Sequence, residues 1–550
     1  MSAALWDVGR LLWLVTVIAT IVCLPEMIMA RTRRPSLASL LAHVAGTAFM
    51  IVVAVSVLSP LRLFNPFTIV LAFAGWPMAL WLVRHGSRPR AEGRSLLRRA
   101  VIDSVILWES ANRRQALLTA IRTGVAGFCA GLRSSGATTR VAIFVVLAAT
   151  VVVTPRFVDA LTNTRLVNPA AYGELVAAQQ LLASERRAAR PEPFAASAAA
   201  LSIASSLAPV HVVRLVPPII GFAVLIVLIA GVHRSTRMLA PALLAAVAFA
   251  LMTRAAARPP GHEFADLFLL LSLLLWNETL AGGRRHRGAA VASTAVLALA
   301  APALVAVLAV AVGALLVYPR LMLMVTGASW LGFAWLAAGS GDSPTLVDLS
   351  ALSNAPLAAS LLIAGVCQLC TAAFGCEYGA RRTALAVAVA VVAALAMVPP
   401  TSAAHFVEYD AAARQSLEIA NSLPKYRFLV VAPVEQWALT YGRGWHMNLH
   451  EFVAAVGRDA GDPGYRLPFD VDDVFVFVET RPFASFDREP QHVAFAALTD
   501  PVFRHYRSPA GRSSLQFAAL DTCERLRQGH PDVRIHYDDG RLRIYRFSLR

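Results

Sequence analysis

The chain has 550 residues, of which 57% are hydrophobic and only 15% are charged, a balance more apolar than that of soluble globular proteins. Its formal net charge at pH 7 is +16, and Lys425 is its only lysine, so arginine supplies nearly all of the positive charge. The arginines cluster in short loops between apolar runs and form no basic face with interleaved aromatic residues. This distribution argues against nucleic acid as a partner.

A series of apolar runs with almost no ionisable residues, separated by arginine clusters, extends from Leu11 to about Pro400. A run of about 20 apolar residues crosses a bilayer as a helix, because a helix satisfies its own backbone hydrogen bonds in lipid. The predicted spans lie, in chain order, within Leu11–Ala30, Leu37–Leu58, Phe67–Val83, Val141–Thr154, Val212–Val232, Leu239–Met252, Phe264–Leu280, Ala289–Tyr318, Leu321–Ala338, Leu357–Phe374 and Thr383–Val398.

The run Ala289–Tyr318 is too long for one span and carries Pro302 near its middle. Because proline interrupts the helical hydrogen-bond ladder, we predict two short helices that turn at Ala301–Pro302. The alternative is one tilted helix, which would invert the direction of every later span. With two helices here, the sequence predicts a polytopic α-helical membrane protein of about twelve spans with a C-terminal soluble α/β domain.

The arginine-rich loops also orient the chain, because positively charged loops stay on the cytoplasmic side of a membrane. This rule places both termini outside and predicts a multi-pass protein of a bacterial-type inner (plasma) membrane, with membrane lipids as partners. The basic stretch after the third span is either an interfacial helix on anionic lipid or a helix packed beneath the bundle. The predicted parts are an N-terminal three-span segment (1–84), a cytoplasmic basic interfacial region (85–140), a membrane core (141–400) with outer loops 156–209 and 254–263, and a periplasmic α/β domain (401–550).

Strand and helix signals alternate in the last 150 residues, as in a small α/β sandwich. Asn448 followed by Glu451, and Ser513 followed by Gln516, match the capping box that begins a helix. The predicted strands are Phe428–Ala432, Val474–Glu479, Val533–Tyr537 and Arg541–Phe547, the last two joined by a hairpin at Asp538-Asp539-Gly540.

Acidic residues of the membrane part lie at the predicted outer ends of spans. Asp159 follows the span Val141–Thr154, and Tyr172 and Glu174 begin a stretch with the spacing of an interfacial amphipathic helix. Glu263 and Asp266 stand at the start of Phe264–Leu280. A carboxylate just outside a span suits a general base toward an acceptor hydroxyl, and a second acidic pair suits a divalent cation. Each carboxylate taken alone is better explained by helix capping.

Taken together, residues 141 to 278 resemble the integral-membrane glycosyltransferases of the C superfamily, including their dolichyl-phosphate-mannose and lipid A glycosyltransferase-like branches. Asp159 stands where that family carries a catalytic acid in the outer loop after the first core span, and Tyr172–Arg187 matches the interfacial helices that follow. The segment Val212–Gly221 is similar to the start of the family's next span. The chain departs from the pattern because Asp159 is followed by Ala160 rather than a second acid, and because three spans precede the matching core.

The resemblance implies transfer of a sugar from a polyprenyl-phosphate donor to an envelope glycan or lipid acceptor on the periplasmic face. It implies Asp159 as the base, Arg214 or Arg258 on the donor phosphate, and Glu263 with Asp266 as ligands of Mg²⁺ or Mn²⁺ or of the acceptor. Tyr172 and Glu174 are expected to bind substrate. Two alternatives stay open: an O-antigen-type polysaccharide polymerase or ligase, which relies on arginines more than on a carboxylate base, and a non-catalytic membrane scaffold of an envelope complex.

Overall fold

The structure is a computed structural model. It describes residues 2–29, 37–59, 137–166, 170–183, 192–236, 239–254, 260–281, 286–317, 322–339, 355–374, 410–432, 434–456, 467–480, 509–530 and 533–549, with single positions between 61 and 73 and at 462 and 465. Three predicted features lie wholly or almost wholly outside these residues, namely the third span (67–83), the basic region 85–140 and the last span (383–398). Arg258 also lies outside them.

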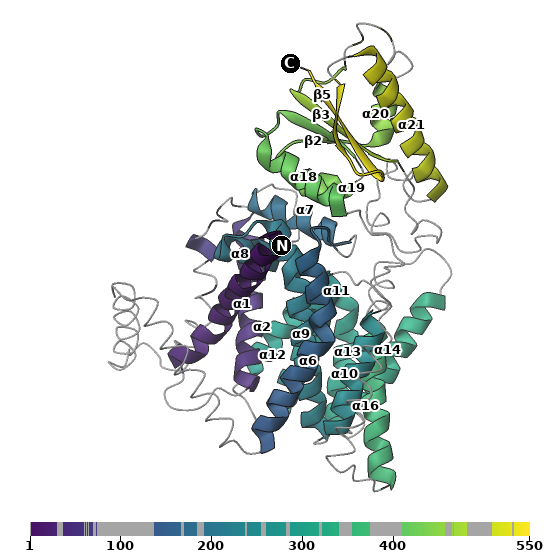
Figure 1. Ribbon diagram of the computed structural model, residues 1–550. Coiled ribbons are helices and arrows are strands. Elements are labelled where there is room, and N and C mark those ends of the chain that lie inside the picture. Colours follow the sequence, from purple (N-terminus) through teal and green to yellow (C-terminus); the bar gives the residue numbers. More distant parts are fainter. Residues whose placement is uncertain are drawn as a thin grey trace.

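Most of the described residues are helical, and the apolar helices pack side by side as a bundle (Figure 1). Two of these helices, represented by Leu40–Leu58 and Pro209–Thr236, are long and apolar enough to cross a membrane. The count of about twelve spans therefore stays a prediction. The helices of the bundle are α1 (Ser2–Met29), α2 (Leu37–Leu58), α6 (Ala137–Thr162), α9 (Pro209–Thr236), α10 (Leu239–Arg254), α11 (Pro260–Leu280), α12 (Arg287–Ala300), α13 (Pro302–Val317), α14 (Met322–Gly339) and α16 (Ala355–Phe374).

The helix is interrupted between α12 and α13 at the predicted position. Ala301 leaves the helical conformation, with φ −153° and ψ 84°, and the next helix starts at Pro302. A proline is favourable in the first turn of a helix, where its missing N–H needs no partner. α12 packs against α2 and α11, whereas α13 packs against α11 and α14.

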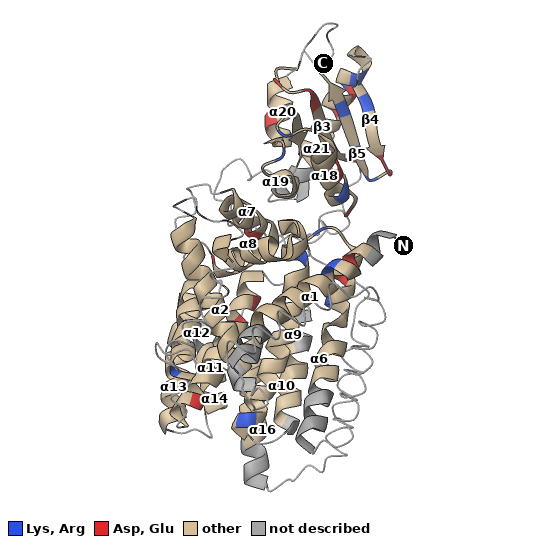
Figure 2. Ribbon diagram, turned by 90° about the vertical axis from the view of Figure 1, so that its left-hand side faces the viewer, with Lys and Arg blue, Asp and Glu red and all other residues tan. Residues whose placement is uncertain are grey.

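Charged residues of the described bundle gather toward its two ends (Figure 2). In α9, Arg214 stands near the start and Arg234 near the end, where Arg234 forms an ion pair with Glu278 of α11. Residues 215–232 between them carry no charge. This stretch is about 27 Å long at 1.5 Å per residue, close to the roughly 30 Å thickness of a bilayer's hydrocarbon core.

Two short helices lie at the end of the bundle where the N-terminus is also found (Figure 1). The first is α7 (Ala170–Leu182), which agrees with the helix predicted from Tyr172 onward. The second, α8 (Pro193–Ser205), was not predicted, because its alanine-rich sequence has no amphipathic pattern and most of its side chains are buried. Pro193 begins α8, and Ser206 ends it in the left-handed conformation.

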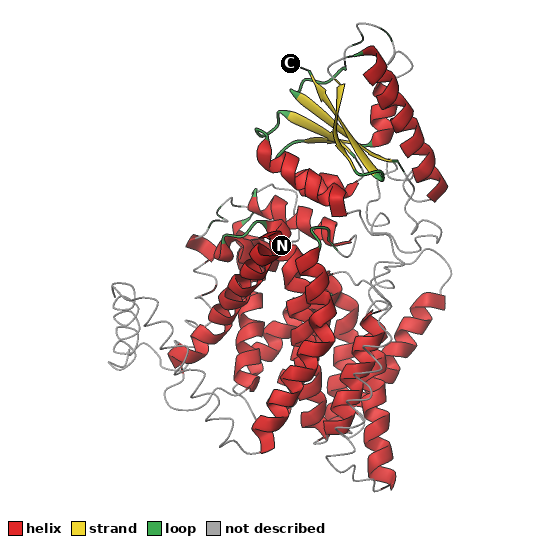
Figure 3. Cartoon of the chain, in the orientation of Figure 1, coloured by secondary structure: helices red, strands yellow, loops and turns green. Residues whose placement is uncertain are grey.

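The α/β part lies at the same end of the bundle and contains a five-stranded sheet with strand order β2-β1-β3-β5-β4 (Figures 1 and 3). β1 is parallel to β2 and β3, and β5 is antiparallel to β3 and β4. Its elements are α18 (Asp410–Ser422), β1 (Phe428–Val431), α19 (Val434–Thr440), β2 (Trp445–Met447), α20 (Leu449–Val456), β3 (Asp473–Glu479), α21 (Pro509–Gly529), β4 (Val533–Asp538) and β5 (Leu542–Ser548).

Helices cover both faces of this sheet, as period-two alternation along β3 requires. Val474 and Val476 pack with residues of α20 and α21, whereas Phe475 and Phe477 pack with α18 on the other face. The predicted strands at β1, β3 and the hairpin are therefore confirmed, and Gly540 supplies the positive φ of 82° in the hairpin turn.

Half of one of the two predicted capping boxes is present, because Asn448 Oδ1 has no hydrogen-bond partner among the described residues. The Asn448 backbone N–H donates to Glu451 Oε2 at 3.1 Å, and α20 begins at the next residue. The predicted helix start at Ser513 is wrong, because α21 already begins at Pro509. Gln516 has a different role: its Oε1 accepts a hydrogen bond from the backbone N–H of Glu479 at 2.8 Å and so ties α21 to β3.

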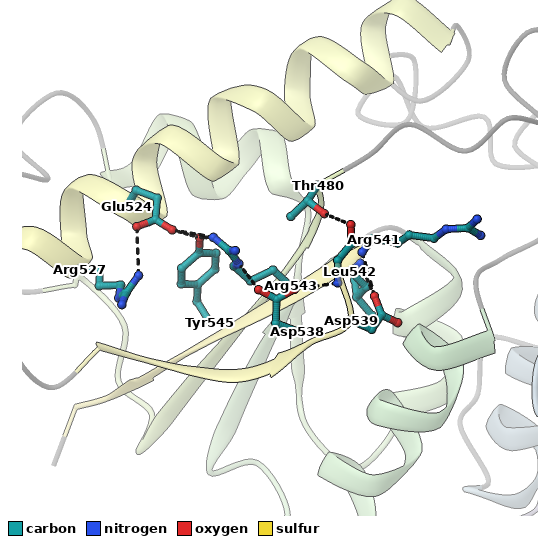
Figure 4. A network of polar contacts seen from close by, with 10 residues as sticks. Thr480, Glu524, Arg527, Asp538, Asp539, Arg541, Leu542, Arg543 and Tyr545 are labelled. Atoms are coloured by element: carbon teal, nitrogen blue, oxygen red, sulfur yellow. Dashed lines mark hydrogen bonds and ion pairs between the residues drawn. The ribbon is translucent and has the colours of Figure 1, made fainter.

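A polar network joins α21 to the β4–β5 hairpin (Figure 4). Glu524 accepts hydrogen bonds from the Tyr545 hydroxyl at 2.5 Å and from Arg543 at 3.0 Å, and Arg543 also pairs with Asp538 at 2.7 Å. The hydrogen bond from Tyr545, together with the nearby Arg527 and Arg543, lowers the pKa of Glu524 below its usual value of 4.5.

The lowered pKa makes the stability of the α/β part depend on pH. Because the folded state holds Glu524 ionised more firmly than the unfolded state does, its stabilising contribution is complete above the unfolded pKa and is lost as pH falls through the folded pKa. Glu524→Gln is therefore expected to make the unfolding temperature less sensitive to acid between about pH 5 and pH 3. Asp521→Asn on the same helix is the control, since the Asp521 side chain is 70% exposed. Equal pH slopes for wild type and Glu524→Gln would contradict the prediction.

Candidate functional site

Asp159 lies in the last turn of α6 and not in a loop. α6 continues through Pro155 to Thr162, so the predicted start of the outer loop at residue 156 is displaced by about two turns. The helix tolerates Pro155 even though proline removes one backbone hydrogen bond. Arg156 and Asp159 are three residues apart and therefore neighbours on one face of the helix.

One oxygen of Asp159 is held and the other is not. Oδ1 accepts hydrogen bonds from Asn163 Nδ2 at 2.7 Å and from Arg165 Nη2 at 3.3 Å. Oδ2 of Asp159 and Nη1 of Arg165 are both buried and have no hydrogen-bond partner among the described residues. A buried polar atom without a partner costs about 1–3 kcal/mol. Other buried atoms at this end of the bundle, such as Glu263 Oε2 and Arg214 Nε, also lack a described partner, but Asp159 and Arg165 leave an acceptor and a donor beside one ion pair.

Arg214, expected to bind the donor phosphate, is instead enclosed by the protein. Its side chain is 3% exposed and pairs with Asp7 of α1 at 2.8 Å. It also donates from Nη1 to the backbone carbonyl of Asn163 at 2.9 Å. Asp7 accepts a second hydrogen bond, from Arg10 at 2.7 Å. Arg214 thus connects α9 with α1 and with the residues that follow Asp159.

Glu263 pairs with Arg156, which joins α11 to α6. The Arg156 guanidinium lies over Gly221 of α9, where an added Cβ would stand 2.5 Å from Nη1 and would displace the end of this side chain. Glu263 belongs to the first turn of α11, and the predicted loop 254–263 is shorter than expected, since α10 includes Arg254 and α11 begins at Pro260.

The described surroundings of Glu263 show how one of its carboxylate oxygens is used. The guanidinium of Arg156 occupies one carboxylate oxygen, and the described residues contain no group of three His, Cys, Asp or Glu side chains placed to hold a metal ion. Asp266 follows one turn later on α11 and is fully buried. Metal dependence through Glu263 and Asp266 stays a prediction.

Tyr172 and Glu174 are both buried on α7, and each contacts a neighbouring segment of the bundle. The Tyr172 hydroxyl accepts a hydrogen bond from the backbone N–H of Leu166 at 3.2 Å. Glu174 Oε1 lies against Gly261 at the start of α11, 2.7 Å from where a Cβ would stand. Burial raises the pKa of Glu174 well above its usual value, and the neighbouring carboxyl of Glu192 raises it further.

The structure thus brings most of the predicted residues to one end of the bundle, but it connects them through side chains that were not among the predicted ligands. Arg156 links Asp159's helix to Glu263, Arg165 and Asn163 bind Asp159, and Asp7 binds Arg214. The two arginines that flank Asp159 in the sequence were a usable signal. Nothing near Asp7 in the sequence points to Arg214, because more than two hundred residues separate them.

Comparisons with known proteins give no further guide to the site. No family profile, no curated protein and no solved structure matches the chain.

Proposed function

We propose that the protein is a membrane glycosyltransferase that moves a sugar from a polyprenyl-phosphate donor to an envelope glycan or lipid acceptor on the periplasmic face. The observation that carries the proposal is the pair of buried, unpartnered atoms at the end of α6, Asp159 Oδ2 and Arg165 Nη1. One can accept a proton and the other can bind an anion. Glycosyl transfer from a lipid phosphate needs both of these functions at the membrane surface.

The order of elements supports the same proposal. An apolar helix ends in the candidate base, two short helices α7 and α8 follow at the end of the bundle, and the chain re-enters the bundle as α9. A lipid-linked donor would reach this end from the bilayer without a nucleotide-binding domain. The apolar stretch of α9 between Arg214 and Arg234 is long enough to cross a bilayer, which supports a membrane around the bundle.

In the proposed reaction, Asp159 Oδ2 takes the proton of the acceptor hydroxyl while the hydroxyl oxygen bonds to C1 of the donor sugar. The bond between C1 and the phosphate oxygen breaks, and its electron pair leaves with the polyprenyl phosphate. Arg165 Nη1 stabilises the negative charge that develops on this leaving group. Asp159 then releases the proton to water, which restores the carboxylate.

The experiment is a transfer assay with the full chain in lipid nanodiscs. Polyprenyl-phosphate donors carrying different radiolabelled hexoses and pentoses are supplied with an envelope lipid and glycan extract as acceptor. The expected result is label in the acceptor fraction and an equal amount of free polyprenyl phosphate for at least one donor. Absence of transfer with every donor, together with absence of binding to polyprenyl phosphate itself, would refute the proposal.

The proposed site needs the α/β part on the outer side of the membrane, and this position is testable by itself. Trypsin added to intact spheroplasts is expected to cleave within residues 401–550, because the positive-inside rule holds the loop around Arg381 and Arg382 in the cytoplasm. The arginine-rich region 85–140 serves as the internal control and should be cleaved only after lysis. Protection of residues 401–550 until lysis would overturn the topology.

A further inference from the structure

Four consecutive residues after α6 are held in place by side chains from three other helices. We call residues 163–166 the linking segment. Arg214 of α9 donates to the Asn163 carbonyl at 2.9 Å, and the Tyr172 hydroxyl of α7 accepts from the Leu166 N–H at 3.2 Å. The two N–H groups between these contacts, those of Thr164 and Arg165, are bound by a residue outside the bundle.

That residue is Asp410, in the first turn of α18 in the α/β part. Its Oδ1 accepts hydrogen bonds from the backbone N–H of Thr164 at 2.5 Å and of Arg165 at 3.0 Å. Its Oδ2 pairs with Arg414 on the same helix at 2.9 Å. A carboxylate that accepts two backbone N–H groups forms charge-assisted bonds, which are about twice as strong as neutral ones.

The contact belongs to a wider junction between the α/β part and the bundle. Ala413 of α18, with Ala438 and Leu439 of α19, is buried in the same apolar cluster as the bundle helices. α19 also packs against α7, the helix that carries Tyr172 (Figure 1). The α/β part is therefore in direct contact with the elements around Asp159.

The linking segment contains Arg165 and so fixes the position of its Cα atom, from which the side chain extends toward Asp159. Arg165 binds Asp410 through its backbone N–H and binds Asp159 through its guanidinium at 3.3 Å. The side chain of Arg165 is 12% exposed, so neighbouring residues enclose it in this position. Release of its backbone from Asp410 would let the guanidinium move away from Asp159.

We propose that Asp410 is a positioning residue of the site. It fixes the linking segment so that Arg165 stays beside Asp159, and in this way the α/β part controls the geometry of the reaction. The effect on catalysis rests on the proposed glycosyltransferase function. The effect on the linking segment and on Arg165 does not, and it can be measured without any substrate.

The variants are Asp410→Ala, which removes both acceptors, and Asp410→Asn, whose amide oxygen still accepts from both N–H groups. Arg414→Ala is the matched control. The Arg414 side chain is 64% exposed, and its removal takes away the ion-pair partner of Asp410 but leaves both hydrogen bonds from Asp410 to the linking segment. Asp410→Ser is used if Asp410→Ala does not fold, since serine also favours a helix start but is too short to bind both amides.

Two measurements are made on the full chain without substrate. Hydrogen–deuterium exchange reports the amides of Thr164 and Arg165, and phenylglyoxal labelling with mass spectrometry reports access to the Arg165 guanidinium. In Asp410→Ala, both amides are expected to exchange at least about tenfold faster, and labelling of Arg165 is expected to rise. Asp410→Asn and Arg414→Ala should stay near wild type. Unchanged exchange and labelling in Asp410→Ala would overturn the proposal.

The transfer assay then tests the catalytic consequence. Asp410→Ala is expected to lower kcat by about 10- to 100-fold, because a displaced group near the reacting atoms is costly, whereas KM for the donor should change little. A kcat near the wild-type value in Asp410→Asn would show that the loss in Asp410→Ala comes from positioning and not from a general loss of folding. Faster exchange without loss of kcat would show that the contact exists but does not position the site. If the wild type transfers no sugar, the proposed function fails while exchange and labelling still decide the role of Asp410.

Discussion

Asp159→Asn is expected to lower glycosyl transfer at least about 100-fold, the size of effect that follows loss of a general base. The amide keeps the shape of the side chain and can place its oxygen where Oδ1 accepts from Asn163 and Arg165. Its nitrogen would then stand at the position of Oδ2, where it cannot take a proton from the acceptor. Initial rates of label transfer from the active donor measure the effect, and expression and unfolding temperature should remain close to wild type.

Two further variants serve as comparisons for Asp159→Asn. Asp521→Asn makes the same chemical change at an exposed site on α21 and should leave transfer unchanged. Arg165→Gln removes the unpartnered donor beside Asp159 and should also lower transfer, since the leaving phosphate loses its cation. Full activity in Asp159→Asn combined with loss in Arg165→Gln would favour the polymerase or ligase alternative. If neither variant affects transfer, both atoms are excluded from the reaction; if the wild type shows no transfer but still assembles with envelope partners, the scaffold alternative is favoured.

The elements that could be predicted are those whose signals are local. A proline in an apolar run predicts an interruption of the helix, and α12 ends at Ala300. Alternating valine and phenylalanine predicts a strand buried on both faces, and β3 is such a strand. Helical spacing predicts α7. In each case, backbone geometry and the burial pattern of neighbouring residues decide the outcome, so a short window of sequence contains the information.

The parts that were missed depend on contacts between distant residues. The predicted span ended at Thr154, but α6 continues for two further turns, where Arg156 pairs with α11 and Asp159 with Arg165. The family resemblance implied Arg214 as a ligand of the donor phosphate, and nothing nearby in the sequence pointed to Asp7 as its partner. Asp410 carries no mark that distinguishes it from any acidic residue at a helix start. These roles follow only from the packing of α1, α9 and α18 around one end of the bundle.

Arg214→Leu is expected to destabilise the protein by about 3–5 kcal/mol, the usual cost of removing one partner of a buried ion pair. Leucine would leave Asp7 with Arg10 alone and would leave the Asn163 carbonyl without its guanidinium donor. The free energy of unfolding in detergent micelles measures the change. Arg10→Leu is a matched control, because it removes the other arginine from the same carboxylate. The Arg10 side chain is 37% exposed, so the expected loss is only about 0–1 kcal/mol.

This comparison also decides what Arg214 does. If the arginine held the donor phosphate, as the family resemblance implies, replacing it would weaken donor binding and leave the substrate-free protein nearly as stable as wild type. If it holds α1 and the linking segment in place, stability falls before any substrate is added. In that case the double variant Asp7→Leu/Arg214→Leu should lose less stability than the two single changes summed, because removing both charges leaves neither one buried alone. Equal effects of Arg214→Leu and Arg10→Leu on stability would contradict the structural role and return Arg214 to the candidate ligands of the phosphate.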